Sequence, residues 1–265
     1  MAESSGISWT DATFNGWIGC TKISPACDGC YAEADNNRRK WVDGWGPGVP
    51  RRRTSASYWK QPLRWQRKYR EGVEDFETGM LIRPPHRPRV FCASLADVFD
   101  NEVPQAWRDD LFALIRSTPD LRWLLLSKRI GNAPKMLPAD WDSGAYRHVG
   151  LMSTLENQEV WDRDYRKLKA IPAAWHGVSA EPLLGPIDMQ VMIAHFGKID
   201  WMITGGESGP NRRPLDMNAV RSIRDQCAHH GITFHHKQNG GLRGKDTGCL
   251  VDGVEHKHFP AALAA

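Results

Sequence analysis

The sequence has no apolar run that approaches the roughly 18 residues that a membrane-spanning helix requires. Its first residues, Met-Ala-Glu-Ser-Ser-Gly, contain neither the basic start nor the apolar stretch of a secretory signal peptide. Both absences predict a cytoplasmic protein without a membrane partner. The content of 41% hydrophobic and 25% charged residues is typical of a globular chain, and we expect residues 1–265 to form one domain.

Cysteine is scarce, and the six present are unevenly placed, three clustered and three scattered. This number is too small for a disulfide scaffold in a chain of 265 residues, so we expect reduced thiols. Cys92 and Cys227 lie within apolar patterns and are expected to pack as small hydrophobic side chains. Cys249 lies in a polar stretch, where it is either a free surface thiol or a distant metal ligand.

The three clustered cysteines lack a fourth nearby. Cys20, Cys27 and Cys30 lie within eleven residues of one another. A structural zinc site is closed by four ligands, whereas an iron–sulfur cluster held by three thiolates keeps one iron open for another molecule. The spacing therefore predicts an iron–sulfur centre with an open position.

Two other uses of these cysteines remain open. Zinc could be held by three thiolates and a histidine, but His86 is distant, and His235 and His236 point to opposite faces of an expected strand. A cluster could also serve only folding or electron transfer.

Short apolar runs alternate with helical patterns beyond the cysteines, which indicates βα units and a largely parallel sheet. We therefore predict an α/β fold, a partial or complete TIM-like (β/α) barrel with an N-terminal cluster loop. An early strand is expected at residues 7–9 or 14–18. Helices are expected at residues 104–117, 158–170 and 216–230. The later strands are expected at residues 89–94, 122–127, 148–153, 175–179, 201–205 and 232–237.

Polar residues or glycines follow the expected strands. The C-terminal ends of the strands form the active site of a βα barrel, so these residues are predicted to line a cofactor and substrate pocket. Serine and glycine also form turns, which explains any one of these positions but explains six of them less well. Glu207 and Lys237 are the catalytic candidates, because Glu207 could face the substrate and Lys237 could donate a proton or hold a phosphate. The other polar residues in this set are Ser94, Asp97, Ser127, Ser153 and Glu181.

Acidic residues are nearly absent from residues 38–70, where eleven Lys or Arg face only Asp43; this stretch carries +10 and the remainder −6. Guanidinium groups neutralise phosphates and flat rings stack on unpaired bases, so the interleaved tryptophans and tyrosines predict a nucleic-acid surface. This surface would belong to a basic, aromatic insertion at about 38–89. A solvated helix with its tryptophans anchored in the core is an equal alternative. The residues expected to contact nucleic acid are Arg51, Arg52, Arg53, Trp59, Lys60 and Arg64.

The Cys-x6-Cys-x2-Cys spacing resembles the cluster loop of the radical S-adenosylmethionine superfamily, where Cys-x3-Cys-x2-Cys follows the first strand of a partial βα barrel. The first gap is longer here, and Gly29 replaces the usual aromatic residue, while Tyr31 follows the last cysteine. Nearly the whole chain also resembles an uncharacterised, radical-SAM-like three-cysteine family of phages and bacteria. The segments that carry this resemblance are Trp9-Thr-Asp-Ala-Thr, Cys20 to Ala32, Ser179-Ala-Glu-Pro-Leu-Leu-Gly-Pro, Gly205-Gly-Glu-Ser-Gly and Phe234-His-His-Lys-Gln.

The resemblance implies that Cys20, Cys27 and Cys30 ligate a [4Fe–4S] cluster whose fourth iron chelates S-adenosyl-L-methionine. Reductive cleavage would give a 5′-deoxyadenosyl radical that abstracts hydrogen from a substrate. An electron donor such as flavodoxin or ferredoxin is then expected. The superfamily's Gly-Gly-Glu element normally follows the second strand, so its role is not transferred to the late Gly205-Gly206-Glu207. The implied cofactor-binding residues are Tyr31, Ser94, Asp97, Ser127, Ser153 and Glu181.

With the basic segment, the resemblance predicts a radical SAM enzyme of the isomerase, lyase or transferase class. Its substrate would be a nucleic-acid base or its appended group, as in DNA hypermodification by phages, and its location the host cytoplasm if a phage encodes it. One alternative is a metal-stabilised, non-catalytic nucleic-acid-binding module. Another is a radical SAM enzyme that acts on a small phosphorylated metabolite.

Overall fold

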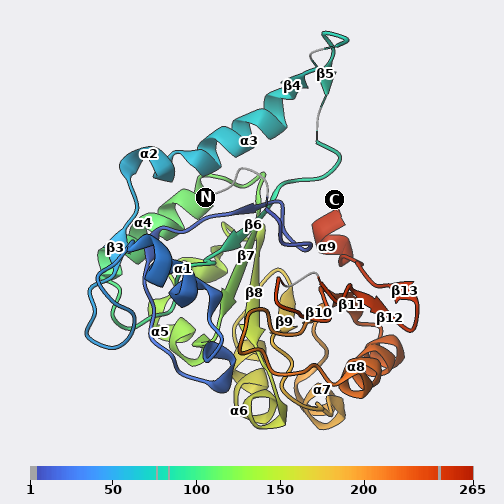
Figure 1. The fold of residues 1–265 in the computed structure, drawn as a ribbon. Helices are drawn as coiled ribbons and strands as arrows, with labels where there is room; N and C mark the ends of the chain where they lie inside the picture. Colours follow the sequence, from blue (N-terminus) through green and yellow to red (C-terminus); the bar gives the residue numbers. More distant parts are fainter. Residues whose placement is uncertain (1–4, 76, 83, 244–245, 265) are drawn as a thin grey trace.

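A computed structural model describes residues 5–75, 77–82, 84–243 and 246–264 of the chain. Seven parallel strands form one curled sheet in the order β1-β6-β7-β8-β9-β10-β11 (Figure 1). The outermost strands, β1 and β11, are not paired with each other in the described part, so the sheet is a partial barrel rather than a complete one. Its strands are β1 (Ala12–Thr13), β6 (Arg89–Cys92), β7 (Arg122–Ser127), β8 (Val149–Thr154), β9 (His176–Ala180), β10 (Trp201–Thr204) and β11 (Thr233–His236).

The sheet is buried on both faces, which explains why its central strands are apolar almost throughout. Successive side chains alternate between the faces. Trp123 and Leu125 belong to the larger core, which also includes residues of the helices, and Figure 1 shows α4 to α8 around this outer side. Phe91, Leu124 and Met152 belong to a second core on the opposite, inner face.

The helices expected from the sequence are confirmed to within one residue at each end. They are α4 (Gln105–Arg116), α6 (Gln158–Lys169) and α8 (Met217–His230). Asp216 caps α8 by accepting a hydrogen bond from the Asn218 N–H over 2.8 Å, and Gly231 ends it with a φ of 62°. Short elements that the sequence did not predict are η1 (Pro25–Cys27), α1 (Tyr31–Arg39), η2 (Ile130–Asn132), α5 (Ala133–Met136), η3 (Trp141–Ser143), α7 (Gln190–Phe196), β12 (Leu250–Val251), β13 (Val254–Glu255) and α9 (Ala261–Ala264). None of the described helices is both long and apolar enough to cross a bilayer.

The six later strands are confirmed to within two residues. Of the two positions proposed for the early strand, residues 7–9 form no strand, and residues 14–18 contain a short strand outside the main sheet. The first strand of the sheet is β1, which lies between them. It is fixed beside β6 because the Thr10 hydroxyl donates to the Arg89 carbonyl over 2.9 Å and the Asp11 carboxylate accepts from the Arg89 side chain. The apolar run at 14–18 instead contributes β2 (Trp17–Ile18), which pairs with β3 (Arg52–Arg53) outside the main sheet.

The basic segment lies between β1 and β6, which are neighbours in the sheet. It forms β3, α2 (Ala56–Trp59), α3 (Gln61–Glu71) and a hairpin of β4 (Val73–Glu74) and β5 (Leu81–Ile82). Figure 1 shows α3 and this hairpin extending away from the sheet. Trp65 of α3 is buried in the main core, whereas Arg64 and Arg67 are exposed. The segment therefore has an anchored tryptophan together with a solvent-exposed basic surface.

Candidate functional site

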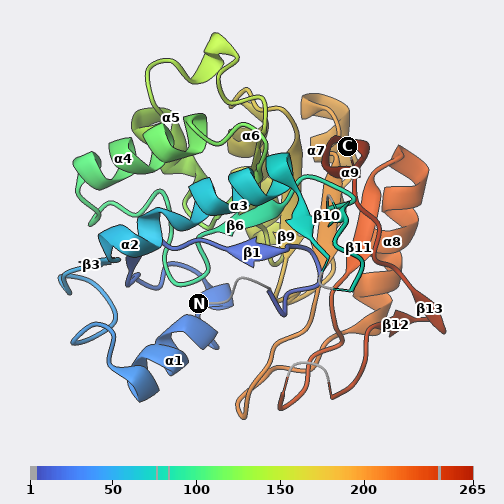
Figure 2. The same ribbon diagram turned by 90° about the horizontal axis from the view of Figure 1, so that it is seen from above.

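A cavity of about 400 Å³ lies on the inner face at the C-terminal ends of the strands. Figure 2 shows α1 and the loops after β10 and β11 on this side of the molecule. Residues from the cysteine loop (residues 20–30), from the strand ends and from these later loops line it together. Five of the predicted catalytic, cofactor-binding and metal-ligating residues meet in this lining, namely Cys30, Tyr31, Glu181, Glu207 and Lys237.

Strand alternation decides which strand-end residues reach the cavity. Thr154 and Ser179 are paired in register on β8 and β9, and both line the cavity. Ser127 and Ser153 are likewise in register, but they occupy the alternate position and are buried outside the lining. The Ser153 hydroxyl donates to the Ser127 carbonyl over 3.3 Å. Thr154 was missed from the sequence, although counting the alternation along β8 would have indicated it.

Ser94 and Asp97 also lie outside the lining, and their side chains form hydrogen bonds with neighbouring residues of the protein. Asp97 accepts hydrogen bonds from the Ser127 hydroxyl over 2.7 Å and from the Lys128 backbone N–H over 3.0 Å. Ser94 accepts one from the Asn15 side chain over 3.0 Å. The cofactor-binding role predicted for these two residues and for Ser127 and Ser153 has no support from the cavity.

The three thiols of the cysteine loop lie in different surroundings. Cys30 lines the cavity and precedes α1, Cys27 is buried in η1, and the Cys20 sulfur accepts a hydrogen bond from Arg129 over 3.3 Å. Burial, with help from Asp97, raises the pKa of the Cys20 thiol to about 12, and Arg129 opposes that shift. All three thiols are free, so the donors of a three-thiolate site are present. Within the described residues, no three His, Cys, Asp or Glu side chains are grouped to hold a metal ion.

The remaining cysteine and histidine predictions concern positions away from this loop. Cys249 donates to the Glu255 carboxylate over 3.3 Å. His235 and His236 point to opposite faces, as expected, because His235 contacts the Ser8 hydroxyl while His236 contacts Thr204.

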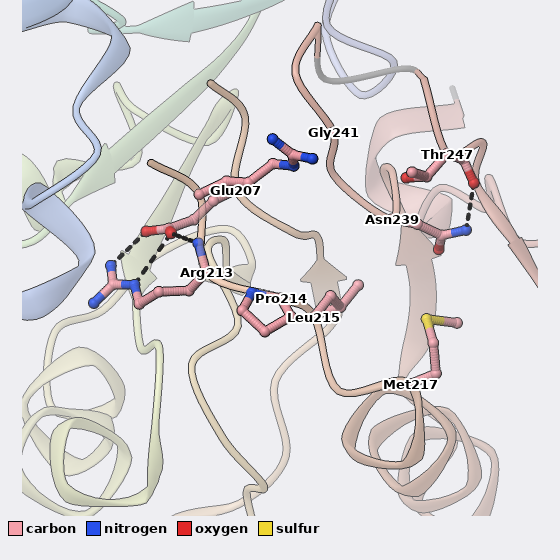
Figure 3. Close-up of a pocket in the computed structure, with 9 residues that line it drawn as sticks. Glu207, Arg213, Pro214, Leu215, Met217, Asn239, Gly241 and Thr247 are labelled. Atoms are coloured by element: carbon pink, nitrogen blue, oxygen red, sulfur yellow. Dashed lines mark hydrogen bonds and ion pairs between the residues drawn. The ribbon is translucent and has the colours of Figure 1, made fainter. Parts of the chain in front are cut away.

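Arg213 joins the loop after β10 to the cysteine loop. Its backbone N–H donates to the Glu207 carboxylate over 2.6 Å and its Nε over 3.1 Å, contacts that Figure 3 draws beside a smaller cavity of about 240 Å³. The same guanidinium donates to the Pro25 carbonyl over 2.7 Å and to Asp28 over 3.4 Å. Burial disfavours ionised Glu207, but the hydrogen bonds from Arg213 outweigh it and lower the pKa of Glu207. Sequence reasoning missed Arg213 and Arg129.

Glu181 and Lys237 form an ion pair within the cavity lining. Their side chains come from the ends of β9 and β11, which are separated by β10 in the sheet. Lys237 lines the cavity, and its charge is balanced by Glu181.

The structure corrects the prediction that Arg51 contacts nucleic acid. Its side chain is 1% exposed and pairs with Asp100 over 2.9 Å, while it also donates to Thr21 over 2.7 Å. Such a guanidinium is not accessible to a phosphate. Arg53 lies over the Trp59 ring at 4.4 Å and pairs with Asp110 over 2.6 Å. Trp59 is half-buried against the core, and the exposed members of the predicted set are Arg52, Arg53, Lys60 and Arg64.

A family model described as "Protein of unknown function (DUF5131)" matches residues 4–260. The chain belongs to this family. No curated protein and no solved structure matches it.

Proposed function

We propose that this protein is a radical S-adenosylmethionine enzyme that modifies or rearranges a nucleic-acid base or its appended group. The observation that carries the proposal is the cavity whose lining combines Cys30 of the cysteine loop and Tyr31 at the start of α1 with Glu181 and Lys237. It lies at the C-terminal ends of a parallel, partial βα barrel, where barrels of this kind place their chemistry.

Cys20, Cys27 and Cys30 are the residues that would hold a [4Fe–4S] cluster, and three thiols on one loop suit that role. When bound, such a cluster supplies an open iron position for S-adenosylmethionine and the electron that cleaves it. The protein supports the loop from two sides. The Glu156 carboxylate accepts from the Ala26 N–H over 3.3 Å, and Arg213 donates to the Pro25 carbonyl.

One cationic contact supports this assignment by opposing the burial and the Asp97 charge that raise the pKa of Cys20. Arg129 donates to the Cys20 sulfur, and a cationic donor stabilises the thiolate form that binds iron. Trp9 and Phe91 line the inner side of the same cavity, and their apolar rings would exclude water from a reactive intermediate.

The nucleic-acid part of the proposal is supported by the exposed cations of the basic segment. Arg52, Lys60 and Arg64 are exposed, and such side chains contact phosphates without reading the base. We expect Lys60→Ala combined with Arg64→Ala to weaken DNA binding and to reduce its dependence on salt concentration, measured by gel shift with single-stranded and duplex DNA. Lys135→Ala, at another exposed lysine, is the control. Unchanged binding in the double variant would argue for a small phosphorylated substrate instead.

The cluster is tested by anaerobic reconstitution with iron and sulfide. We expect the wild-type chain to take up about four irons, to show the broad absorption of thiolate-bound iron, and to change its electron paramagnetic resonance when S-adenosylmethionine is added. Cys27→Ala should lose all three properties. Cys227→Ala, which removes a buried thiol in α8, should keep them. A colourless, zinc-containing protein, or a Cys27→Ala variant that still cleaves S-adenosylmethionine, would refute the proposal.

A further inference from the structure

Two residues of the cavity lining carry a buried polar atom that has no hydrogen-bond partner among the described residues, namely the Trp9 Nε1–H and the Thr154 hydroxyl. Both residues are only 2% exposed. Leaving a buried polar group unpaired is energetically unfavourable, so such groups in a cavity wall indicate a ligand that pairs with them. One is a donor only, and the other can donate or accept.

Flat, apolar side chains share the cavity lining with these two atoms. The Trp9 and Phe91 rings lie 4.7 Å apart between centroids, and Leu126 and Pro182 complete this part of the lining. Aromatic faces of this kind favour a planar ring ligand through stacking. Together with the donor of Trp9 and the hydroxyl of Thr154, they suit a heterocycle that has hydrogen-bonding atoms along its edge.

The charges of the lining favour an anion. The Glu181–Lys237 and Glu207–Arg213 pairs are internally balanced. Two further cations, Lys128 and Arg243, line the cavity. Among the residues that the structure describes, neither side chain forms an ion pair, and the Asp246 carboxylate beside Arg243 accepts from its backbone N–H. Counted over the lining itself, the cations Lys128, Lys237 and Arg243 exceed the carboxylates Glu181 and Glu207 by one positive charge, which a phosphate group would neutralise.

We infer that the cavity binds one nucleotide, with its base between the Trp9 and Thr154 polar atoms and its phosphate at Lys128 and Arg243. A volume of about 400 Å³ is at the lower end of the range for small-ligand pockets, so a base pair would not fit and a base from a duplex must be extruded. This inference deepens the proposed function and rests on it for the reaction, but nucleotide binding itself requires no cluster.

The test uses equilibrium dialysis of the full, iron-free chain with each deoxynucleoside 5′-monophosphate and with the matching deoxynucleoside. We expect saturable binding of at least one nucleotide. Thr154→Val should weaken nucleotide and nucleoside equally, by about tenfold for one lost hydrogen bond. Lys128→Met should weaken the nucleotide alone. The controls are Thr233→Val on β11 and Lys135→Met, both outside the lining.

Several results would overturn the inference. These are the absence of nucleotide binding, variants that bind as their controls do, and complete displacement of the nucleotide by S-adenosylmethionine, which would assign the base site to that molecule. If Thr154→Val fails to fold, Lys128→Met at the half-buried rim decides the outcome alone. A chain that binds nucleotide but never loads iron would refute the proposed function and leave this inference standing.

Discussion

The Arg129 guanidinium donates a hydrogen bond to the Cys20 sulfur over 3.3 Å, although 109 positions separate the two residues. Arg129 also donates to the Thr21 carbonyl and pairs with the buried Asp97 carboxylate over 3.5 Å. One cation after β7 thus orients the start of the cysteine loop and partly offsets the burial of its first thiol.

Arg129→Met is expected to make Cys20 less reactive. The charge that opposes the raised pKa of Cys20 would be lost, and each unit of further increase lowers the thiolate fraction about tenfold. Iodoacetamide labelling of the iron-free protein at pH 8, followed by mass spectrometry of each cysteine peptide, measures the change against Cys249. Arg129→Lys keeps a cation, so Cys20 in this variant should label at a rate between those of the wild type and Arg129→Met. A Cys20 rate that does not fall in Arg129→Met would contradict this role.

Arg51→Ala is expected to lower the free energy of unfolding by about 3–5 kcal/mol, because it leaves the buried Asp100 carboxylate without its partner. The neighbouring Arg52→Ala removes an exposed side chain and should change the free energy of unfolding by less than about 0.5 kcal/mol. Urea denaturation at pH 7 compares the two. Equal stabilities would mean that the Arg51–Asp100 pair does not support the fold.

Stability should fall as the pH falls from 7 to 5, and His235 should contribute. Burial, with the nearby charge of Lys257, lowers the pKa of His235 from 6.5 to about 3, so the unfolded chain binds a proton in this interval that the folded chain does not. The resulting loss is about 2 kcal/mol between pH 7 and pH 5. Urea midpoints of wild type and His235→Gln measure it. The variant should show a shallower pH dependence, and an identical slope would exclude His235 as a cause.

Glu181→Gln and Lys237→Met are each expected to weaken S-adenosylmethionine binding several-fold, because either change leaves the other charge unpaired in the cavity. The double variant should bind better than the sum of the two losses predicts, since the residues act as a pair. Calorimetry on reconstituted protein gives the dissociation constants, with Glu159→Gln on the exposed side of α6 as control. An unchanged dissociation constant for Glu181→Gln would remove this residue from the binding site.

Local sequence patterns were enough to locate the later strands and the longer helices. β7 and α8 could be read from apolar runs, a capping Asp216 and a terminating Gly231, because these signals act over a few residues. The early strand could not be read this way. Its place is fixed by contacts of Thr10 and Asp11 with Arg89, about 80 positions away.

The sequence by itself determined the βα rhythm, the three thiols on one loop and the concentration of basic charge, because periodicity, spacing and composition are properties of neighbouring residues. Only the tertiary structure decided which of those residues share a site. It buried Arg51 against Asp100, paired Glu181 with Lys237, and placed Arg129 beside Cys20. The physical reason is that charge pairing and burial depend on distance in space, and the curvature of the sheet brings together residues that the chain keeps far apart.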